Sequence, residues 1–506
     1  MVLPGQHRTK FSRREPVVTR SSDQTGAHVL ALASNALTHD TRILKQIGSL
    51  SRAGYRVSAL AMGGAEPSAH DLSDPARHIY RFASGDLMQD PRPDSAGAAS
   101  GMYAGAVGAA IDRFFEAHRD VEDIRQGLRL KRLVTGLHWS GAVRRARRRH
   151  HRDLRTRIAT LIQDSTAGPE RLLVAAGYDA AMRRFTAQAP EWAARLEQAG
   201  PPRVVHAHDL YTLGAGIALA ERHGARLIYD AHEYEPERMP PLPHAQKQAI
   251  VAFEDYALAR ADATITVSDG IAGFYRRRHS GLDVRLVMNC PEVRAHGKDA
   301  DAVPGLRARM GLSPEVPLAA FIGLPTLGGR GLQVVFDALK ICPEIHLAIL
   351  GPRRAELDDA LTAALAQMGL SDRVHLLEPV RPHQVVAAIG EADLSLCLIQ
   401  DHSLSYRHAM PNKLFEALMA GVPTLVSDLP DMAALIREHR AGMVVDQTDA
   451  TAVANAMQQI LADRAAFVPA SDAREALAQE CSWEGQEAVL LQLYEDLLSE
   501  TDSSRS

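Results

Sequence analysis

The sequence has few cysteines and lacks the paired spacing of metal or redox motifs. Four cysteines occur in 506 residues, and no two of them are separated by just two other residues. This spacing excludes CxxC zinc and redox motifs. Sparse, unpaired cysteine is typical of proteins from a reducing compartment, so we expect a cytoplasmic protein. The cysteines are Cys290, Cys342, Cys397 and Cys481.

Long apolar runs are also missing. No run of 18 apolar residues occurs, so the sequence predicts no membrane-spanning helix. Residues 1–26 are polar and basic and lack the apolar core of a secretory signal, so we expect a disordered basic tail there. A net charge of −4 argues against nucleic acid as a partner of the whole chain. The length and the 46% hydrophobic content predict two or three domains with sizeable cores.

What the chain does contain is a repeated order of strand, loop and helix. An apolar strand at 29–33, a helix at 41–53 and a strand at 55–61 form a βαβ unit, which implies a parallel sheet. The same order returns over 203–288 and over 317–427. It predicts an α/β protein with two doubly wound, Rossmann-like domains facing each other across an interdomain cleft. The predicted domains are 27–298 and 299–480, followed by a final helical segment at 481–506.

Residues 84–198 interrupt this order and are predicted to form a helical, basic insertion in the first domain. Eight arginines fall between Arg144 and Arg157, after a segment rich in leucine with Trp139. A basic helix with such an apolar face is suited to an anionic membrane surface. A solvated surface helix explains the same pattern. Nucleic-acid binding is not favoured, because no aromatic residues are interleaved with the arginines.

The segment 411–427 carries the most specific pattern. Pro411 suits the start of a helix, and Gly421 suits the left-handed residue that ends one. Lys413 and Glu416 would share one face near the positive helix N-terminus. This combination suits a phosphate beside a ribose diol, as in a nucleotide sugar. An amphipathic helix with two solvated charges is the alternative interpretation.

Further candidate residues follow predicted strands. Arg330 lies in a glycine-rich loop, where its guanidinium could bind phosphate while the glycines allow close backbone approach; a plain glycine turn is the alternative. His206, His208 and Asp209 resemble metal ligands by type, but polar binding residues also collect at such strand ends, and we predict no metal.

Two more of these residues have a structural alternative. His232 follows a predicted strand and belongs either to the site or to the core. Asp40 belongs to the site or simply caps the helix that follows it.

Five stretches in this order resemble GT-B glycosyltransferases of family 4, the group 1 glycosyl transferases. They are residues 35–42, 206–213, 229–233, 321–323 with 330–332, and 411–416. The resemblance implies that Arg330 and Lys413 contact the donor diphosphate and that His232 lies near the reacting sugar. It implies that Glu416 binds the donor ribose. It places the remaining candidates on the donor side (Asn412, Gly323, Gly329, His408) or the acceptor side (Asn35, Asp40, Arg42, His208, Asp209, Glu233).

The resemblance also implies a reaction and an architecture. A sugar would move from a nucleoside diphosphate sugar to an acceptor with retention, without a metal or cofactor. We expect a saccharide acceptor, either lipid-linked or a cell-envelope polysaccharide precursor, and a peripheral position at the inner membrane face. Family members also fold their last helix, here within 481–506, back onto the first domain.

Three departures from the family pattern keep other functions open. His408 stands where relatives commonly have glutamate, Pro411 replaces a glycine, and Leu324 replaces an arginine. A degenerate transferase that binds nucleotide as a scaffold would tolerate these changes. A nucleotide-sugar epimerase on the same fold is the other alternative.

Overall fold

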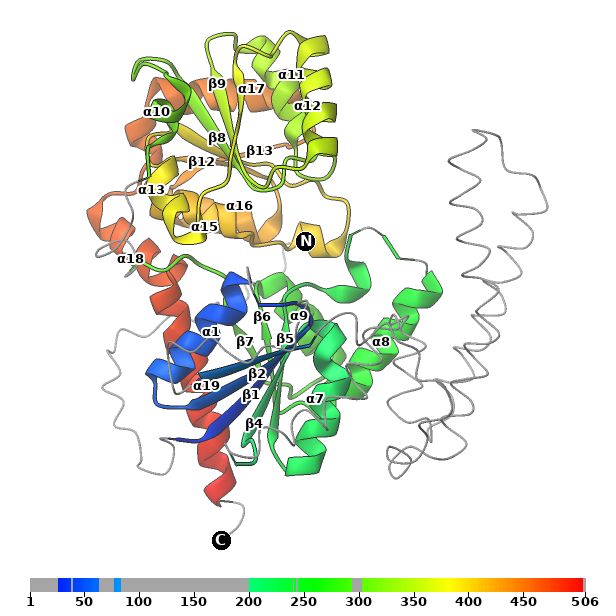
Figure 1. Ribbon diagram of the computed structural model, residues 1–506. Helices are drawn as coiled ribbons and strands as arrows, with labels where there is room; N and C mark the ends of the chain where they lie inside the picture. The colour runs from blue at the N-terminus through cyan, green and yellow to red at the C-terminus, as the bar shows by residue number, and fades with distance from the viewer. Residues whose placement is uncertain are drawn as a thin grey trace, which may run out of the picture.

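The protein consists of two parallel sheets, each covered by helices on both faces (Figure 1). The predicted α/β class with two Rossmann-like domains is therefore confirmed. The predictions for the tail 1–26 and the insertion 84–198, including Arg144–Arg157, fall almost wholly outside the described residues. This computed structural model describes residues 26–37, 40–62, 77–82, 200–239, 241–242, 244–293 and 303–503.

The N-terminal sheet has seven strands in the order β3-β2-β1-β4-β5-β6-β7. The strand order reverses between β1 and β4, where Ala31 of β1 lies opposite His206 of β4. Ligands of doubly wound sheets bind outside the carboxyl ends of strands near such a reversal. The strands are β1 (His28–Ala33), β2 (Arg56–Met62), β3 (Arg77–Phe82), β4 (Val204–His208), β5 (Arg226–Ala231), β6 (Ala263–Thr266) and β7 (Val284–Leu286). Their helices are α1 (Thr41–Arg52), α7 (Asp209–His223), η3 (Glu235–Glu237), α8 (His244–Leu258) and α9 (Asp269–Arg278).

The C-terminal sheet has six strands in the order β10-β9-β8-β11-β12-β13, with its reversal between β8 and β11. Its strands are β8 (Leu318–Ile322), β9 (His346–Leu350), β10 (Val374–Leu377), β11 (Leu394–Cys397), β12 (Thr424–Ser427) and β13 (Gly442–Val445). The helices around it are α10 (Leu306–Met310), α11 (Leu332–Ile341), α12 (Ala355–Met368), η5 (Pro382–Gln384), α13 (Val385–Ile389), α14 (Leu404–Arg407), α15 (Asn412–Met419), α16 (Pro430–His439), α17 (Ala450–Ala462), η6 (Arg464–Phe467) and α18 (Ser471–Cys481).

The last helix, α19 (Trp483–Ser503), lies beside α1 and the N-terminal sheet (Figure 1). Trp483 donates from its indole nitrogen to the Ser49 hydroxyl of α1 over 2.9 Å. Tyr494 is fully buried in the same core and its hydroxyl lies 2.8 Å from His206 Nδ1. The preceding α18 still packs on the C-terminal domain, so this connection joins the two domains. Within the described part of the chain, no helix is long and apolar enough to cross a membrane.

Helix α15 is positioned by local sequence chemistry. Pro411 was predicted in the first turn of the helix, but it lies just before that turn, as an extended N-cap residue. Gly421 follows the helix with φ of 69°, as predicted. Leu414 and Phe415 are fully buried and hold the helix against the sheet. Strand β12 begins only after Pro423, because proline has no N–H for the strand ladder. Helix α15 is therefore held in place, with its N-terminus directed toward the N-terminal domain.

Candidate active site

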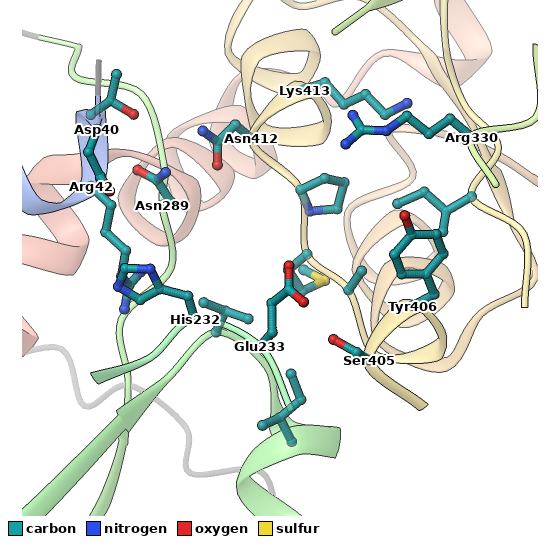
Figure 2. Close-up of a pocket in the computed structure, with 17 residues that line it drawn as sticks. Asp40, Arg42, His232, Glu233, Asn289, Arg330, Ser405, Tyr406, Asn412 and Lys413 are labelled. Atoms are coloured by element: carbon teal, nitrogen blue, oxygen red, sulfur yellow. The ribbon is translucent and has the colours of Figure 1, made fainter. Parts of the chain in front are cut away.

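A cavity of about 450 Å³ lies between the two domains, at the carboxyl ends of their strands (Figure 2). Its N-terminal wall is formed by the start of α1 and by residues that follow β5, β6 and β7. Its C-terminal wall is formed by α14, the N-terminus of α15 and the loops after β8 and β11. The polar lining residues are Asp40, Thr41, Arg42, His232, Glu233, Asn289, Arg330, Ser405, Tyr406, Asn412 and Lys413.

The C-terminal wall carries two cations side by side, Lys413 and Arg330 (Figure 2). Lys413 is only 7% exposed, and its ammonium has no hydrogen-bond partner in the structure. It lies 4.4 Å from the centre of the Phe321 ring, which offers a cation–π contact but no acceptor. Burial lowers the pKa of Lys413. A buried ammonium without a hydrogen-bond partner, at a helix N-terminus, is an arrangement suited to binding an anion.

Glu416 lies one turn further along α15 and does not line the cavity. Burial raises the pKa of its carboxyl to about 7, against the opposing effects of Lys45 and Lys413. Lys45 belongs to α1 of the other domain and donates to the Cys290 carbonyl. Burial lowers the pKa of Lys45 to about 8. The Glu416 carboxyl of one domain and the Lys45 ammonium of the other therefore both have pKa values close to neutral pH.

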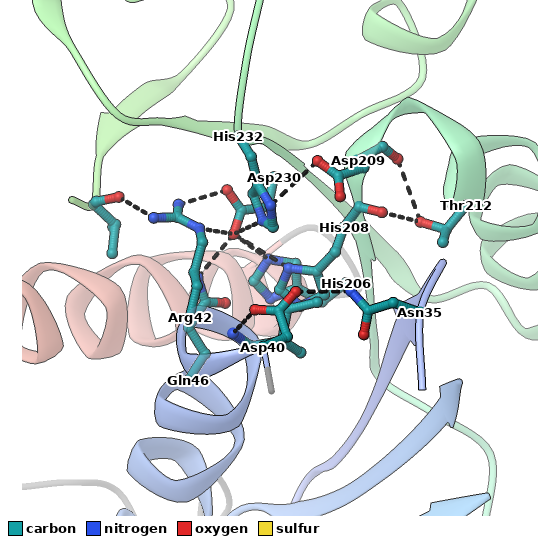
Figure 3. A network of polar contacts seen from close by, with 12 residues as sticks. Asn35, Asp40, Arg42, Gln46, His206, His208, Asp209, Thr212, Asp230 and His232 are labelled. Atoms are coloured by element: carbon teal, nitrogen blue, oxygen red, sulfur yellow. Dashed lines mark hydrogen bonds and ion pairs between the residues drawn. The ribbon is translucent and has the colours of Figure 1, made fainter. Parts of the chain in front are cut away.

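Asp230, at the end of β5, is the centre of a buried polar network (Figure 3). Arg42 donates to both carboxylate oxygens, over 2.6 and 3.1 Å, and also to the Val287 carbonyl over 2.6 Å. Gln46 donates over 2.8 Å. Burial alone would raise the pKa of Asp230, but the Arg42 guanidinium and the nearby imidazoles outweigh it and hold that pKa well below its ordinary value.

Three imidazoles converge on one oxygen of Asp230. Nitrogens of His206, His208 and His232 lie 3.7, 3.3 and 3.5 Å from Oδ2. The other nitrogen of His232 lies 3.2 Å from Asp209. Burial lowers the pKa of His232, but the carboxylates of Asp209 and Asp230 outweigh it, so the pKa is raised. The two carboxylates that flank the ring therefore favour the protonated form of His232.

Among the described residues, His206, His208 and Asp230 are the set that has the donor types and spacing of a metal site. Both oxygens of Asp230 already accept hydrogen bonds from Arg42, and one also accepts from Gln46. The guanidinium charge at this position opposes a second cation. We therefore describe the set as a hydrogen-bonded network around a buried ion pair.

Asp40 takes part in two features of the structure. It caps α1 by accepting from the Ile43 amide over 3.1 Å, and it also lines the cavity. Asn35 donates to its other oxygen over 2.8 Å and so fixes the carboxylate rather than facing the cavity itself. His208 and Asp209 likewise lie behind the cavity lining and contact it through His232.

The glycines of the loop after β8 do not line the cavity. Gly323, Gly329 and Gly331 have left-handed φ values of 110°, 79° and 82°. A Cβ on Gly331 would lie 2.2 Å from the Leu398 carbonyl oxygen, so no other residue fits there. From this loop, only the Arg330 side chain reaches the cavity.

His408 is also absent from the cavity lining. Its Nδ1 lies 2.7 Å from the carboxylate of Asp431, at the contact between the domains. The family resemblance places His408 next to the donor sugar, and that placement stays a prediction.

Several residues of the site were not singled out from the sequence. Asp230 could have been found, because a carboxylate at the end of a buried strand is unusual. Gln46 had a weaker signal, as a polar residue on the apolar side of α1. Asn289, Ser405 and Tyr406 lie in a loop and a one-turn helix, where no periodic pattern marks them.

Two doubly wound sheets that face each other across a polar cavity define a GT-B architecture, and comparison with solved structures agrees. Sucrose-phosphate synthase from Thermosynechococcus elongatus superimposes with a TM-score of 0.62 at 18% identity, covering 94% of this chain and all of that one. Anabaena HepE in complex with UDP gives 0.56 at 14% identity, covering 93% of this chain and 100% of that one.

Comparison with known sequences identifies the family as well as the fold. Residues 319–463 match the family model described as glycosyl transferases group 1, and residues 142–291 match a glycosyl transferase 4-like domain. A D-inositol 3-phosphate glycosyltransferase of Nocardia farcinica is 26% identical over 68% of this chain and 78% of its own length. An alpha-maltose-1-phosphate synthase of Mycolicibacterium smegmatis is 25% identical over 58% and 78%. The chain belongs to the group 1 glycosyl transferases and is a glycosyltransferase.

Proposed function

We propose that the protein transfers a sugar from a nucleoside diphosphate sugar to a hydroxylated acceptor, with retention of the anomeric configuration. The observation that carries this proposal is the buried, unpartnered ammonium of Lys413 beside Arg330 at the N-terminus of α15. A diphosphate would supply the acceptors that this cluster lacks. A related fold, Anabaena HepE, binds UDP and UDP-glucose in its solved structures, which supports the same donor class here.

The cavity suggests how the reaction proceeds. As the bond between the anomeric carbon and the diphosphate oxygen breaks, negative charge builds on the leaving group. Lys413, Arg330 and the free amides of α15 would stabilise this charge, so no metal ion is required in the mechanism that we propose. The acceptor hydroxyl would attack from the same face and pass its proton to the departing phosphate. His232, which lines the cavity, would lie beside the reacting sugar. Inverted product in an assay of anomeric configuration would contradict this mechanism.

The acceptor is proposed to be a saccharide carried on a lipid or belonging to a cell-envelope polysaccharide precursor. A relative from Xanthomonas campestris, named as a mannosyltransferase acting on a cellobiosyl-diphosphopolyprenol, is 28% identical over 26% of this chain and 32% of its own length. The eight arginines of 144–157 would hold the enzyme at the anionic inner face of a membrane. Equal sedimentation of the full chain with neutral and anionic vesicles would rule out this membrane contact.

Nucleotide binding tests the proposed donor. Melting curves of the full chain are measured with UDP, GDP, ADP and TDP and their sugars. One nucleotide should raise the melting temperature of the wild type, because a ligand that binds only the native state stabilises it. Lys413→Ala and Glu416→Ala should blunt that rise. No shift with any nucleotide would contradict the proposed donor class. A rise in melting temperature without turnover of the donor on any acceptor would favour the scaffold alternative. Turnover of the donor in the absence of an acceptor would favour the epimerase.

The proposed ribose contact of Glu416 predicts a pH dependence. An ionised carboxyl accepts hydrogen bonds from the two hydroxyls of a diol more strongly than a neutral one, and the pKa of Glu416 in the free protein is about 7. Nucleotide affinity should therefore rise as the pH increases through about 7. Calorimetric titrations between pH 5.5 and 8.5 measure this, and Glu416→Gln is the matched control. The nucleotide phosphate titrates equally in both proteins. If the affinity of the wild type rises no more steeply with pH than that of Glu416→Gln, the ribose contact of Glu416 is contradicted.

A further inference from the structure

His408 occupies a bridge between the two domains. It ends α14, and its Nδ1 lies 2.7 Å from Oδ2 of Asp431 in the first turn of α16. Both residues belong to the C-terminal domain. The other oxygen of Asp431 accepts a hydrogen bond from the backbone amide of Gly270, at the start of α9 in the N-terminal domain, over 3.1 Å. A single carboxylate thus joins an imidazole of one domain to a helix N-terminus of the other.

The imidazole also packs directly against α9. Its ring meets Phe274 edge-on, with centroids 5.3 Å apart. A Cβ placed on Gly270 would lie 1.8 Å from His408 Nδ1, so the close approach of the domains requires glycine there. The side chains of His408 and Asp431 are only 15% and 11% exposed. This shielding from solvent strengthens their interaction relative to a surface pair.

The bridge is connected to both walls of the cavity. Phe274 stacks on Tyr234 with centroids 4.8 Å apart, and Tyr234 directly follows His232 and Glu233 of the N-terminal wall. On the other side, α14 carries Ser405 and Tyr406 of the C-terminal wall and packs on η3. A shift of His408 would therefore move the two walls relative to one another.

We propose that His408, Asp431 and Gly270 form an interdomain clasp that holds the two walls of the cavity in the arrangement needed for transfer. His408 is then a positioning residue, which acts through domain closure instead of touching the donor sugar. The inference rests on the proposed transferase function. The clasp provides contacts that exist only when the two domains are closed. Losing these contacts would therefore shift the population toward open forms.

The clasp makes a specific prediction for three substitutions. His408→Ala, Asp431→Ala and Gly270→Ala should each lower kcat/KM for transfer by roughly tenfold, the usual effect of losing a hydrogen bond to a charged group. The double variant His408→Ala/Asp431→Ala should be no worse than Asp431→Ala alone, because that change already removes the contacts of the carboxylate with both His408 and Gly270. Affinity for free nucleotide should stay at the wild-type value, since Lys413 and Arg330 lie in one domain. His408→Asn should recover part of the activity by placing an amide near Nδ1.

Gly273→Ala, one turn along α9, is the matched control. Its Cβ would meet only the flexible end of Arg277 on the same helix, at 3.0 Å. Alanine has a higher helix propensity than glycine at both positions. The effects of Gly270→Ala and Gly273→Ala should therefore differ only through the collision with His408. Hydrogen exchange should be faster at the start of α9 in His408→Asn and His408→Ala than in the wild type, with unchanged core strands, which gives a readout independent of activity.

Two results would overturn the clasp. If His408→Ala weakens the nucleotide sugar but not the free nucleotide, while Asp431→Ala and Gly270→Ala behave as the wild type, His408 is a sugar contact. If exchange at α9 is the same in all variants, the domains are not held together at this point. Failure of the wild type to bind any nucleotide would instead refute the proposed function, which this design keeps distinct.

Discussion

Replacing Lys413 with methionine should lower kcat for sugar transfer by about 10²–10³-fold, the typical loss on removing one group that stabilises developing charge. Its ammonium is buried, has no partner in the free protein and lies beside Arg330. The charge it faces would grow as the diphosphate departs. Steady-state kinetics at saturating donor measure the effect, and Lys413→Arg, which keeps the charge, is the control.

The same substitution should leave the free protein as stable as the wild type or more stable. Burying an ammonium without an acceptor costs free energy, and methionine removes that cost while keeping the length of the side chain. Because the folded pKa of Lys413 is lowered, the folded state binds fewer protons than the unfolded state as the pH passes that pKa. Wild-type stability should therefore rise with pH between the lowered pKa and about 10.4, the ordinary value for lysine.

Urea unfolding of the two proteins at several pH values tests this second part. Loss of activity together with a clear loss of stability would show that Lys413 supports the fold, and would count against an anion site. Loss of activity with retained or increased stability is the expected pattern for a residue whose burial serves ligand binding.

Replacing Asp230 with alanine should lower the free energy of unfolding by about 3–5 kcal/mol, the usual cost of removing one partner of a buried ion pair. The change leaves the Arg42 guanidinium, whose side chain is 4% exposed, without its carboxylate. It also removes the partner of Gln46 and of three imidazoles. Urea unfolding at pH 7 measures the loss. Asp230→Asn, which keeps the shape but not the charge, should lose less.

The pH dependence of this contribution has a defined sign. The folded pKa of Asp230 is depressed, so its stabilisation is fully present above the unfolded pKa of about 3.9 and is lost as the pH falls toward the folded value. The wild type should approach the variant in stability only in strongly acidic solution. If Asp230→Ala unfolds at the wild-type urea concentration at pH 7, the network does not hold the N-terminal wall. A double variant with Arg42→Met should recover stability, because it removes the unpaired charge as well.

The sequence predicted most of the sheet-forming elements because they are encoded over short stretches. The repeated order of apolar strands and helices was predicted over 29–61, 203–288 and 317–427, and eleven of the thirteen strands that the structure describes lie in or overlap these ranges. The two strands outside these ranges, β3 and β13, each lie at an edge of their sheet. The helix with Lys413 was placed well because Pro411 and Gly421 mark its ends through local backbone geometry.

The site itself depended on contacts that no local pattern contains. Arg42 and Asp230 lie 188 residues apart, yet they form the ion pair that organises the N-terminal wall. The contacts of His408 with Asp431 and of its ring with the start of α9 join residues that are far apart in the sequence, and no local pattern indicates them.

The sequence by itself therefore determined the α/β architecture, the family and the chemical types present, since periodicity, helix ends and motifs depend on neighbouring residues. Only the tertiary structure decided which charges are buried, which are paired and which, like Lys413, remain without a partner. The physical reason is that desolvation and pairing depend on how two domains pack, and this packing joins residues that are hundreds of positions apart.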